Sequence, residues 1–356
     1  MGNFFNDNLQ THFERGAAYI IAEIGVNHEG SMEIAKRLID EAKEGGADAA
    51  KFQTYKAGTI ASKNSPAYWD TSKESTDSQF KLFQKYDGFG ADQYKELSRY
   101  CEKVGIEFAS TPFDLEAVDM LDPLMNYFKI ASADITNLPL LRKVASKAKP
   151  VILSTGASNL SEIELALSEL KQYGADEICL MHCILNYPTE DKNANLAMLP
   201  SLARSFPDVT LGYSDHTEPS DDMMAVIVAY LGGAMVIEKH FTHDKSLPGN
   251  DHYHAMDKVD LEKLRALLGR IDSLQGSADH KFALESEKPA VRNARRSIIA
   301  KHDLEPGHIL GADDLICKRP GTGISPVHWD EILGRKLVAA VSEDEALSWS
   351  HFAEGP

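Results

Sequence analysis

Short apolar runs alternate along the chain with segments in which apolar residues recur at a helical spacing. The first run, Tyr19–Gly25, is compact and almost wholly apolar, which is typical of a parallel strand covered on both faces. Over residues 31–45 the apolar positions share one helical face. Ser31 is the predicted N-cap of this helix, and the two glycines at 45 and 46 are its predicted stop.

Eight strand-like runs of this kind follow one another in the first 241 residues. They cover residues 19–25, 49–55, 107–113, 127–132, 150–155, 177–183, 210–215 and 235–241. Helical patterns lie between most of them, for example over residues 160–173 and 221–231. The pattern predicts an α/β fold, a (β/α)8 TIM barrel. An open, doubly wound sheet is the alternative, but it usually has fewer strands and a glycine-rich loop after the first, and no GxGxxG follows residue 25.

The spacing of the runs also predicts how the chain divides. We expect a barrel domain over residues 1–280, a locally basic linker over 281–296, and a small β-rich domain over 297–356, where short strands and turns replace the βα pattern. A polar, aromatic-rich insertion at 56–90 follows the second run. Loops at that end of a barrel carry function, so it is a candidate lid, with an extra helix on the barrel rim as the alternative.

Composition narrows the class of protein. With 43% hydrophobic and 26% charged residues, the chain has the make-up of a globular protein. Its net charge of −17 argues against binding to nucleic acid or to an anionic membrane surface. The sequence shows neither an apolar run of membrane-spanning length nor a secretory signal, and its four cysteines form no CxxC pair. We therefore expect a cytoplasmic protein with reduced thiols.

Polar residues gather at the ends of the apolar runs, where a barrel builds its active site. Lys51 and Lys129 are two cations placed in the barrel mouth, and a buried lysine is costly unless it meets an anion. Together with the hydroxyl groups of Thr111, Ser132 and Ser154 they indicate a bound phosphate or carboxylate. The alternative is that the lysines only pair with carboxylates of the protein, Glu23 and Glu238.

Two histidines, His216 and His240, end the seventh and eighth runs, which are neighbours in a barrel. Two imidazoles near carboxylates suit a divalent metal such as Mn²⁺ or Mg²⁺. The following loop adds three histidines, His243, His252 and His254, so zinc stays open. The alternative for each histidine is an ordinary hydrogen-bonding role.

At this point the chain resembles the sialic acid (N-acetylneuraminate) synthase family along nearly its whole length. The matching segments are AEIGVNHEG (22–30), KFQTY (51–55), STPFD (110–114), FKIAS (128–132), LSTG (153–156), HC with YPT (182–189), GYSDHT (212–217), EKHFT (238–242) and LPGNDH (247–252). Residues 302–324, which contain HDLEPGHIL and KRPGTGI, look like the antifreeze-like (SAF) domain that closes these enzymes.

The resemblance implies a transferase that condenses phosphoenolpyruvate, an aldose such as N-acetylmannosamine, and water into a sialic acid-type nonulosonate, with release of phosphate. It implies substrate-binding residues, which are Lys51, Gln53, Thr111, Lys129, Ser132, Ser154 and Tyr187. It implies metal ligands, His216 and His240, with Mn²⁺ as the usual ion and Mg²⁺ or Co²⁺ as alternatives. The carboxylates it offers for catalysis are Glu23, Asp134, Glu238 and Asp251. Arg319 matches an arginine inserted into the partner's site, which implies a domain-swapped homodimer.

Some positions depart from the family pattern. Leu185 stands where the family can have asparagine, Asp134 stands where a glutamate is frequent, and the loop at 247–257 is unusually rich in histidine. These departures leave other sugars open: a diacetamido sugar (legionaminic or pseudaminic acid), mannose, or a phosphorylated hexose.

Two readings outside this family also stay open. One is the related condensation with a phosphorylated pentose or tetrose, against which the C-terminal domain counts. The other is a non-catalytic sugar-binding scaffold, which we would expect to have lost lysine or histidine at the strand ends.

Overall fold

Eight parallel strands form the centre of the first part of the chain. The structure is a computed structural model that describes residues 18–69, 71–72, 74–249 and 251–353. The strands are β1 (Tyr19–Gly25), β2 (Ala49–Thr54), β3 (Glu107–Pro112), β4 (Phe128–Ile130), β5 (Val151–Ser154), β6 (Ile178–Cys183), β7 (Thr210–Asp215) and β8 (Val236–His240). All eight lie within the runs predicted from the sequence.

The strands curl into a nearly closed barrel. Their hydrogen-bonded order is β3-β2-β1-β8-β7-β6-β5-β4, and every pairing in it is parallel. The two ends of this order, β3 and β4, lie next to each other and complete the ring. The predicted TIM barrel is therefore confirmed, and the open-sheet alternative is excluded.

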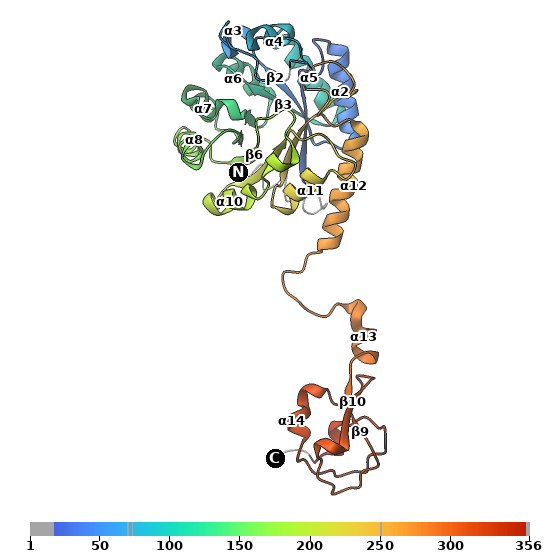
Figure 1. Cartoon of the computed structure of the whole chain (residues 1–356). Coiled ribbons are helices and arrows are strands. Elements are labelled where there is room, and N and C mark those ends of the chain that lie inside the picture. The colour runs from blue at the N-terminus through green and yellow to red at the C-terminus, as the bar shows by residue number, and fades with distance from the viewer. Residues whose placement is uncertain (1–17, 70, 73, 250, 354–356) are drawn as a thin grey trace. The chain divides into compact units, whose positions relative to one another are not determined.

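Helices surround the barrel (Figure 1). The longer ones are α2 (Met32–Gly45), α5 (Ala91–Val104), α6 (Leu115–Leu121), α7 (Leu138–Ala145), α8 (Leu160–Gln172), α10 (Met198–Ser205), α11 (Met224–Leu231) and α12 (Lys258–Gln275). A single turn, α9 (Asp191–Ala194), precedes α10. None of the helices in the described ranges combines the length and the apolar character needed to cross a membrane.

Local signals set the ends of the first and last of the predicted helices. The Ser31 side chain accepts a hydrogen bond from the Ile34 N–H, and Gly46 closes α2 in the left-handed region, with φ of 96°. The helix expected from residue 221 begins only at Met224. The reason is local, because the side chains of Ser220 and Asp222 accept from the Met224 N–H and hold the preceding residues in a turn.

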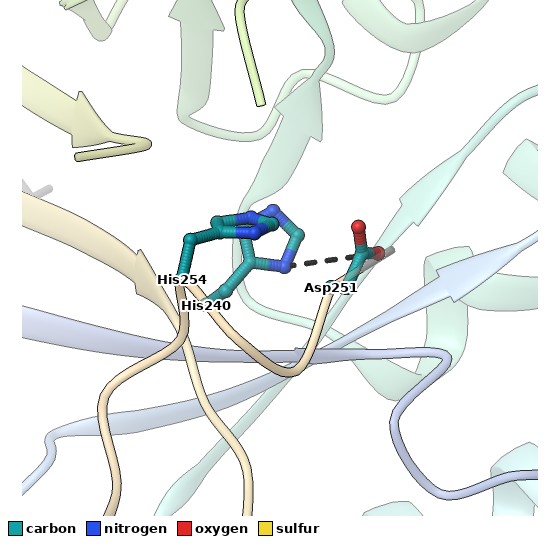
Figure 2. Close-up of side chains that lie close together, drawn as sticks. All are labelled: His240, Asp251 and His254. Atoms are coloured by element: carbon teal, nitrogen blue, oxygen red, sulfur yellow. Dashed lines mark ion pairs between the residues drawn. The ribbon is translucent and has the colours of Figure 1, made fainter. Parts of the chain in front are cut away.

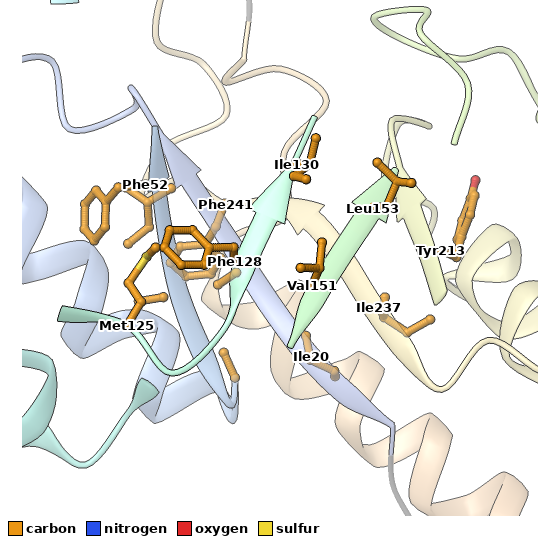
Figure 3. Packing of buried hydrophobic residues seen from close by; sticks show 14 of the residues in the cluster. Ile20, Phe52, Met125, Phe128, Ile130, Val151, Leu153, Tyr213, Ile237 and Phe241 are labelled. Carbon is orange, nitrogen blue, oxygen red and sulfur yellow. The ribbon is translucent and has the colours of Figure 1, made fainter. Parts of the chain in front are cut away.

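Alternation along the strands sorts their side chains between two environments. Outward-facing residues such as Phe52, Phe128 and Ile237 pack against the helices and form the main core (Figure 3). Inward-facing residues near the strand starts form a second, separate apolar cluster that fills the barrel. Its buried members are Tyr19, Ile21, Ala49, Ala109, Tyr127, Ile152, Cys179, Met181 and Val236. The barrel is therefore closed below by an apolar floor.

The insertion after β2 is ordered around two short helices, α3 (Ala57–Ile60) and α4 (Gln79–Tyr86). A bridge between Pro66 and Ser78 ties its two sides together. Phe83 contacts Tyr55 at the end of β2, with ring centroids 5.1 Å apart. The insertion thus packs on the rim of the barrel mouth, which is one of the two alternatives drawn from the sequence. That it moves as a lid stays a prediction.

The chain divides into two compact units between Gly276 and Ser277. In the second unit β9 (Ser297–Ala300) pairs antiparallel with β10 (Leu315–Lys318), and bridges between turns extend this small sheet. A short helix, α14 (Trp329–Ile332), contributes Ile332 to an apolar core of its own. The basic segment predicted as a linker contains helix α13 (Lys288–Asn293), and the Arg292 carbonyl accepts from the Gly321 N–H.

One buried ion pair locks β7 to β8 on the outer side of the barrel. The Lys239 ammonium lies 2.7 Å from an Asp215 carboxylate oxygen, and each side chain is only 1% exposed. Asp215 also accepts from the Tyr213 hydroxyl, from the Thr217 hydroxyl and from the Thr217 N–H. The network is satisfied within the protein, which makes it structural.

We predict that Asp215→Asn destabilises the barrel by about 3–5 kcal/mol, because it leaves a buried lysine without its counter-charge. Adding Lys239→Met should restore most of that free energy of unfolding, since no buried charge then remains. Urea unfolding followed by circular dichroism measures both.

The matched control is Glu44→Gln, which breaks an exposed pair with Lys258 of similar length, 2.6 Å. Its effect should stay below about 1 kcal/mol. Equal losses for the two single variants would contradict the prediction.

Candidate active site

A cavity of about 400 Å³ opens at the carboxyl ends of the strands, above the apolar floor. It is lined by every site residue expected from the sequence except Arg319: Glu23, Lys51, Gln53, Thr111, Lys129, Ser132, Asp134, Ser154, Tyr187, His216, Glu238, His240 and Asp251. The strand pattern explains this convergence, because inward positions at the ends of parallel strands meet at one end of a barrel. Arg319 belongs to the second unit, and its part in the site stays a prediction.

Two lysines and two glutamates form the centre of the cavity. Lys51 makes an ion pair with Glu23 and lies 3.6 Å from Glu238. Lys129 lies 3.3 Å from the other oxygen of Glu238, and the Ser214 hydroxyl donates to that oxygen at 3.0 Å. All four charged side chains are buried. The pairing with carboxylates that the sequence left open is thus present, and it keeps both ammonium groups inside the barrel.

The two glutamates differ in proton affinity. Burial, reinforced by the nearby Glu238, raises the pKa of Glu23 from its ordinary value of 4.5 to about 7, although Lys51 opposes the change. Burial acts on Glu238 in the same direction, but Lys129 and Lys51 outweigh it and lower the pKa of Glu238 to about 2. A pair of carboxyl groups with separated pKa values is suited to acid and base roles. Glu23 is the one that can exchange a proton near neutral pH.

Hydroxyl groups surround the two lysines. The Lys51 ammonium donates to the Thr111 hydroxyl at 3.1 Å. The Ser132 hydroxyl accepts from the Gly156 N–H at 2.8 Å, which fixes the turn after β5. The Ser154 hydroxyl is buried and has no hydrogen-bond partner among the described residues. An unpaired buried hydroxyl is costly, so its presence here favours a ligand that completes the site.

The outer part of the cavity has a different character. Aromatic side chains from the insertion and from neighbouring loops line it, namely Tyr55, Tyr68, Trp69, Phe83, Tyr86 and Phe113. Asp134 lies in a 3-10 turn after β4 and accepts from the Asn137 side chain at 3.0 Å, and burial raises the pKa of Asp134. This region offers ring faces together with the carboxyl groups of Asp134 and Asp251, which suits a polar ligand with apolar substituents.

Histidines gather on one side of the cavity. His240, Asp251 and His254 offer ligand atoms that all lie within 4.8 Å of one another, so they could hold a metal ion (Figure 2). Burial, and then neighbouring histidines, lower the pKa values of His240 and His254, which keeps both rings in the neutral form that binds metals.

The predicted ligand His216 lies beside this group. Its ring centroid is 5.5 Å from that of His240, and its Nδ1 is 2.7 Å from the Ile184 carbonyl. That contact leaves Nε2 available. His254 was not among the ligands expected from the sequence, and its only signal was the unusual number of histidines in the loop at 247–257.

Known proteins with similar sequences and structures were found over both units. Residues 38–281 match the NeuB family, and residues 295–353 match the SAF domain. An N,N'-diacetyllegionaminic acid synthase of Campylobacter jejuni is 40% identical over 92% of this chain and 98% of its own length. The human N-acetylneuraminate-9-phosphate synthase is 33% identical over 92% of this chain and 91% of its own length.

A solved structure is also similar to this chain. The N-acetylneuraminic acid synthetase of Leptospira borgpetersenii aligns with a TM-score of 0.68 and 33% identity, over 77% of this chain and 90% of its own. These similarities define an enzyme, a transferase of the kind that condenses phosphoenolpyruvate with a sugar. The chain belongs to the NeuB family and carries a C-terminal SAF domain.

We predict a pH effect on stability from Glu23. Between pH 4.5 and about 7 the folded chain keeps this carboxyl protonated while the unfolded chain releases the proton, so stability falls as pH rises through that window. The contribution reaches at most about 1.4 kcal/mol per pH unit. Glu238, lowered to about 2, acts below pH 4.5 and does not affect this window.

In Glu23→Gln the fall between pH 4.5 and 7 should therefore be smaller than in the wild type, as measured by urea unfolding at several pH values. Glu44→Gln, which alters a 61% exposed carboxylate, serves as the control and should follow the wild type. Identical pH profiles for Glu23→Gln and the wild type would mean that Glu23 is ionised throughout.

Proposed function

We propose that the chain is a nonulosonate synthase that joins phosphoenolpyruvate to the open-chain form of an unphosphorylated N-acetylated hexose. The observation that carries this proposal is the pair of buried lysines beside the unpaired Ser154 hydroxyl, at the mouth of a barrel of this family. Water is the third reactant and phosphate the second product.

The phosphoenolpyruvate would lie in the deep layer of the cavity. Lys51 and Lys129 would bind its carboxylate and phosphate groups, with Thr111, Ser132 and Ser154 as hydroxyl donors and Tyr187 and Gln53 at the edge. Below a pH of about 7, where Glu23 is protonated and Glu238 is ionised, the two lysines leave one net positive charge at this layer. An anion entering it exchanges the internal ion pairs for charge-assisted bonds of its own.

In the reaction, C3 of phosphoenolpyruvate forms a bond to the aldehyde carbon of the sugar, and water adds at C2. Loss of phosphate by cleavage of the C2–O bond then leaves the 2-keto acid. Glu23, with a pKa of about 7, is the group suited to move a proton at the water or at the aldehyde oxygen. Asp134 and Asp251, which line the cavity, would accept hydrogen bonds from sugar hydroxyls, and ionised Glu238 would hold the lysines.

The histidine side of the cavity fits a divalent metal, since the imidazoles of His240 and His254 and the Asp251 carboxylate converge there. His216 and His240 would hold the ion, with Mn²⁺ as the expected metal. When bound, the ion supplies Lewis-acid polarisation of the aldehyde.

Three observations favour a diacetamido hexose as the sugar. Lys51 and Lys129 are the only lysine or arginine side chains among the described residues that line the cavity, so the barrel itself offers no further described cation for a sugar phosphate. The aromatic wall can pack against acetamido methyl groups. Identity to the N,N'-diacetyllegionaminic acid synthase of C. jejuni, 40%, exceeds the 33% to the human N-acetylneuraminate-9-phosphate synthase. N-acetylmannosamine, expected from the sequence, is the second candidate.

We predict that phosphate is released from phosphoenolpyruvate only when Mn²⁺ and a suitable sugar are both present. In a panel of sugars, kcat/KM should be highest for the diacetamido hexose that corresponds to N,N'-diacetyllegionaminic acid. It should be lower for N-acetylmannosamine and lowest for mannose and hexose phosphates. Colorimetric phosphate assays and mass spectrometry of the product measure this.

Lys129→Met tests the anion site. It removes a charge-assisted hydrogen bond of about 1.5–3 kcal/mol, so kcat/KM for phosphoenolpyruvate should fall at least about tenfold. A folded wild type that releases phosphate with no sugar of the panel would overturn the proposal. A higher value with N-acetylmannosamine would change only the sugar.

We also propose that Arg319 completes the cavity of a second copy of the chain in a domain-swapped homodimer. Arg319 is exposed, and the loop around it is fixed by two bonds, from the Ser297 hydroxyl to the Pro320 carbonyl and from the Gly321 N–H to the Arg292 carbonyl. A planar guanidinium group on a fixed loop can donate to carboxylates and sugar hydroxyls.

The test mixes two inactive variants, Arg319→Ala and His240→Ala. In a swapped dimer one site of each mixed pair has both residues intact, so about a quarter of all sites should regain activity after subunit exchange. If each chain completes its own site, every site in the mixture lacks one residue and no activity returns. Size-exclusion chromatography with light scattering checks that exchange has occurred.

A further inference from the structure

His254 stands out among the buried histidines of the barrel. It is fully buried, and both of its ring nitrogens lack a hydrogen-bond partner within the described residues. Two other buried histidines have a hydrogen-bond partner. His182 Nε2 contacts the Ala194 carbonyl at 2.8 Å, and His252 Nδ1 contacts the Thr242 hydroxyl at 2.8 Å. Burying a polar group without a hydrogen-bond partner is costly, so an unpaired ring here indicates a missing ligand.

The position of the His254 ring, beside His240 and His216, indicates that the missing ligand is a metal ion. The His254 ring centroid is 4.9 Å from that of His240 and 6.4 Å from that of His216. His240 Nδ1, which is also buried and lacks a hydrogen bond, lies 3.9 Å from an Asp251 oxygen (Figure 2).

Ligand atoms around a tetrahedral ion lie about 3.4 Å apart, given bonds of about 2.1 Å. The ligand atoms of His240, Asp251 and His254 lie within 4.8 Å of one another. Each pair of atoms therefore has to close by at most about 1.4 Å for the three to share an ion.

The direction of approach is also compatible with catalysis. His216, His240 and Asp251 line the cavity, whereas His254 is not among its described lining residues. A ligand from His254 would thus reach the ion from the protein side. The cavity side stays open for a substrate oxygen, as a catalytic metal site requires.

We infer that His254 is an additional imidazole ligand, which makes the metal site of this chain richer in nitrogen than the two-histidine site expected from the sequence. Imidazole ligands favour ions such as Zn²⁺ and Co²⁺, whereas oxygen ligands suit Mg²⁺ and Mn²⁺. The chain should therefore bind Co²⁺ and Zn²⁺ more tightly than Mn²⁺ and should discriminate strongly against Mg²⁺. This inference rests on the proposed function for the purpose of the site, but the binding itself needs no substrate.

The test is a Co²⁺ titration of the metal-stripped full chain, without phosphoenolpyruvate or sugar, followed by visible absorption and calorimetry. His254→Gln keeps the approximate size of the ring and is compared with His254→Ala, His182→Gln and the wild type. We expect Kd for Co²⁺ to rise at least tenfold in both His254 variants, with an altered visible spectrum and a weaker preference over Mg²⁺. His182→Gln, a buried histidine outside the cavity lining, should match the wild type.

A second measurement does not depend on the variants folding. X-ray absorption of the Co²⁺-loaded wild type should show three imidazoles on the ion in place of two. Unchanged Co²⁺ affinity and spectrum in a folded His254→Gln, or a count of two imidazoles, would overturn the inference. Failure of phosphate release, with three imidazoles present, would count against the proposed function and leave this inference standing.

Discussion

Two ammonium groups buried in a barrel are not hydrated and therefore need carboxylate partners, and this requirement shapes the whole site. Glu238 serves both lysines, with one oxygen toward Lys129 and the other toward Lys51, and Ser214 orients it. Glu23 is the second partner of Lys51, and burial raises the pKa of Glu23 to about 7, so this carboxyl group can take up or release a proton near neutral pH. In the function proposed above, a substrate anion would replace protein carboxylates as partner of the lysines. The site can therefore stay folded when empty and still bind an anion firmly.

The sequence was sufficient to predict the barrel and most of its mouth because both follow from strand periodicity. A parallel strand covered on two faces reads as an apolar run, and its inward residues near the carboxyl end point into the cavity, so Lys51, Lys129 and Glu238 could be placed by position alone. His254 could not, since it lies in a loop whose path depends on tertiary packing. For the same reason the sequence did not show that part of the basic segment 281–296 forms α13 within the second unit.

The cavity combines a deep charged layer with an outer aromatic layer, and the two have different origins in the chain. The deep layer comes from strand ends, which the barrel fixes. The outer layer comes largely from the insertion between β2 and β3, whose Tyr68 and Trp69 can vary without disturbing the strands. We therefore expect changes in the insertion to alter the sugar preference of this chain without altering the deep layer. This division explains why family membership is clear while the sugar requires an experiment.

The apolar floor of the barrel has a kinetic consequence. Tyr19, Tyr127 and Met181 close the end opposite the mouth, so whatever occupies the lysine layer must enter and leave through the aromatic layer above it. A sugar seated against the aromatic wall would bar the path to the lysines. With phosphoenolpyruvate in the deep layer, the two substrates would have to bind in a fixed order. Phosphoenolpyruvate would bind first and the sugar second. A sugar that binds first would block access to the lysines. Excess sugar would therefore slow the enzyme, because it would hold the enzyme in a complex that cannot bind phosphoenolpyruvate.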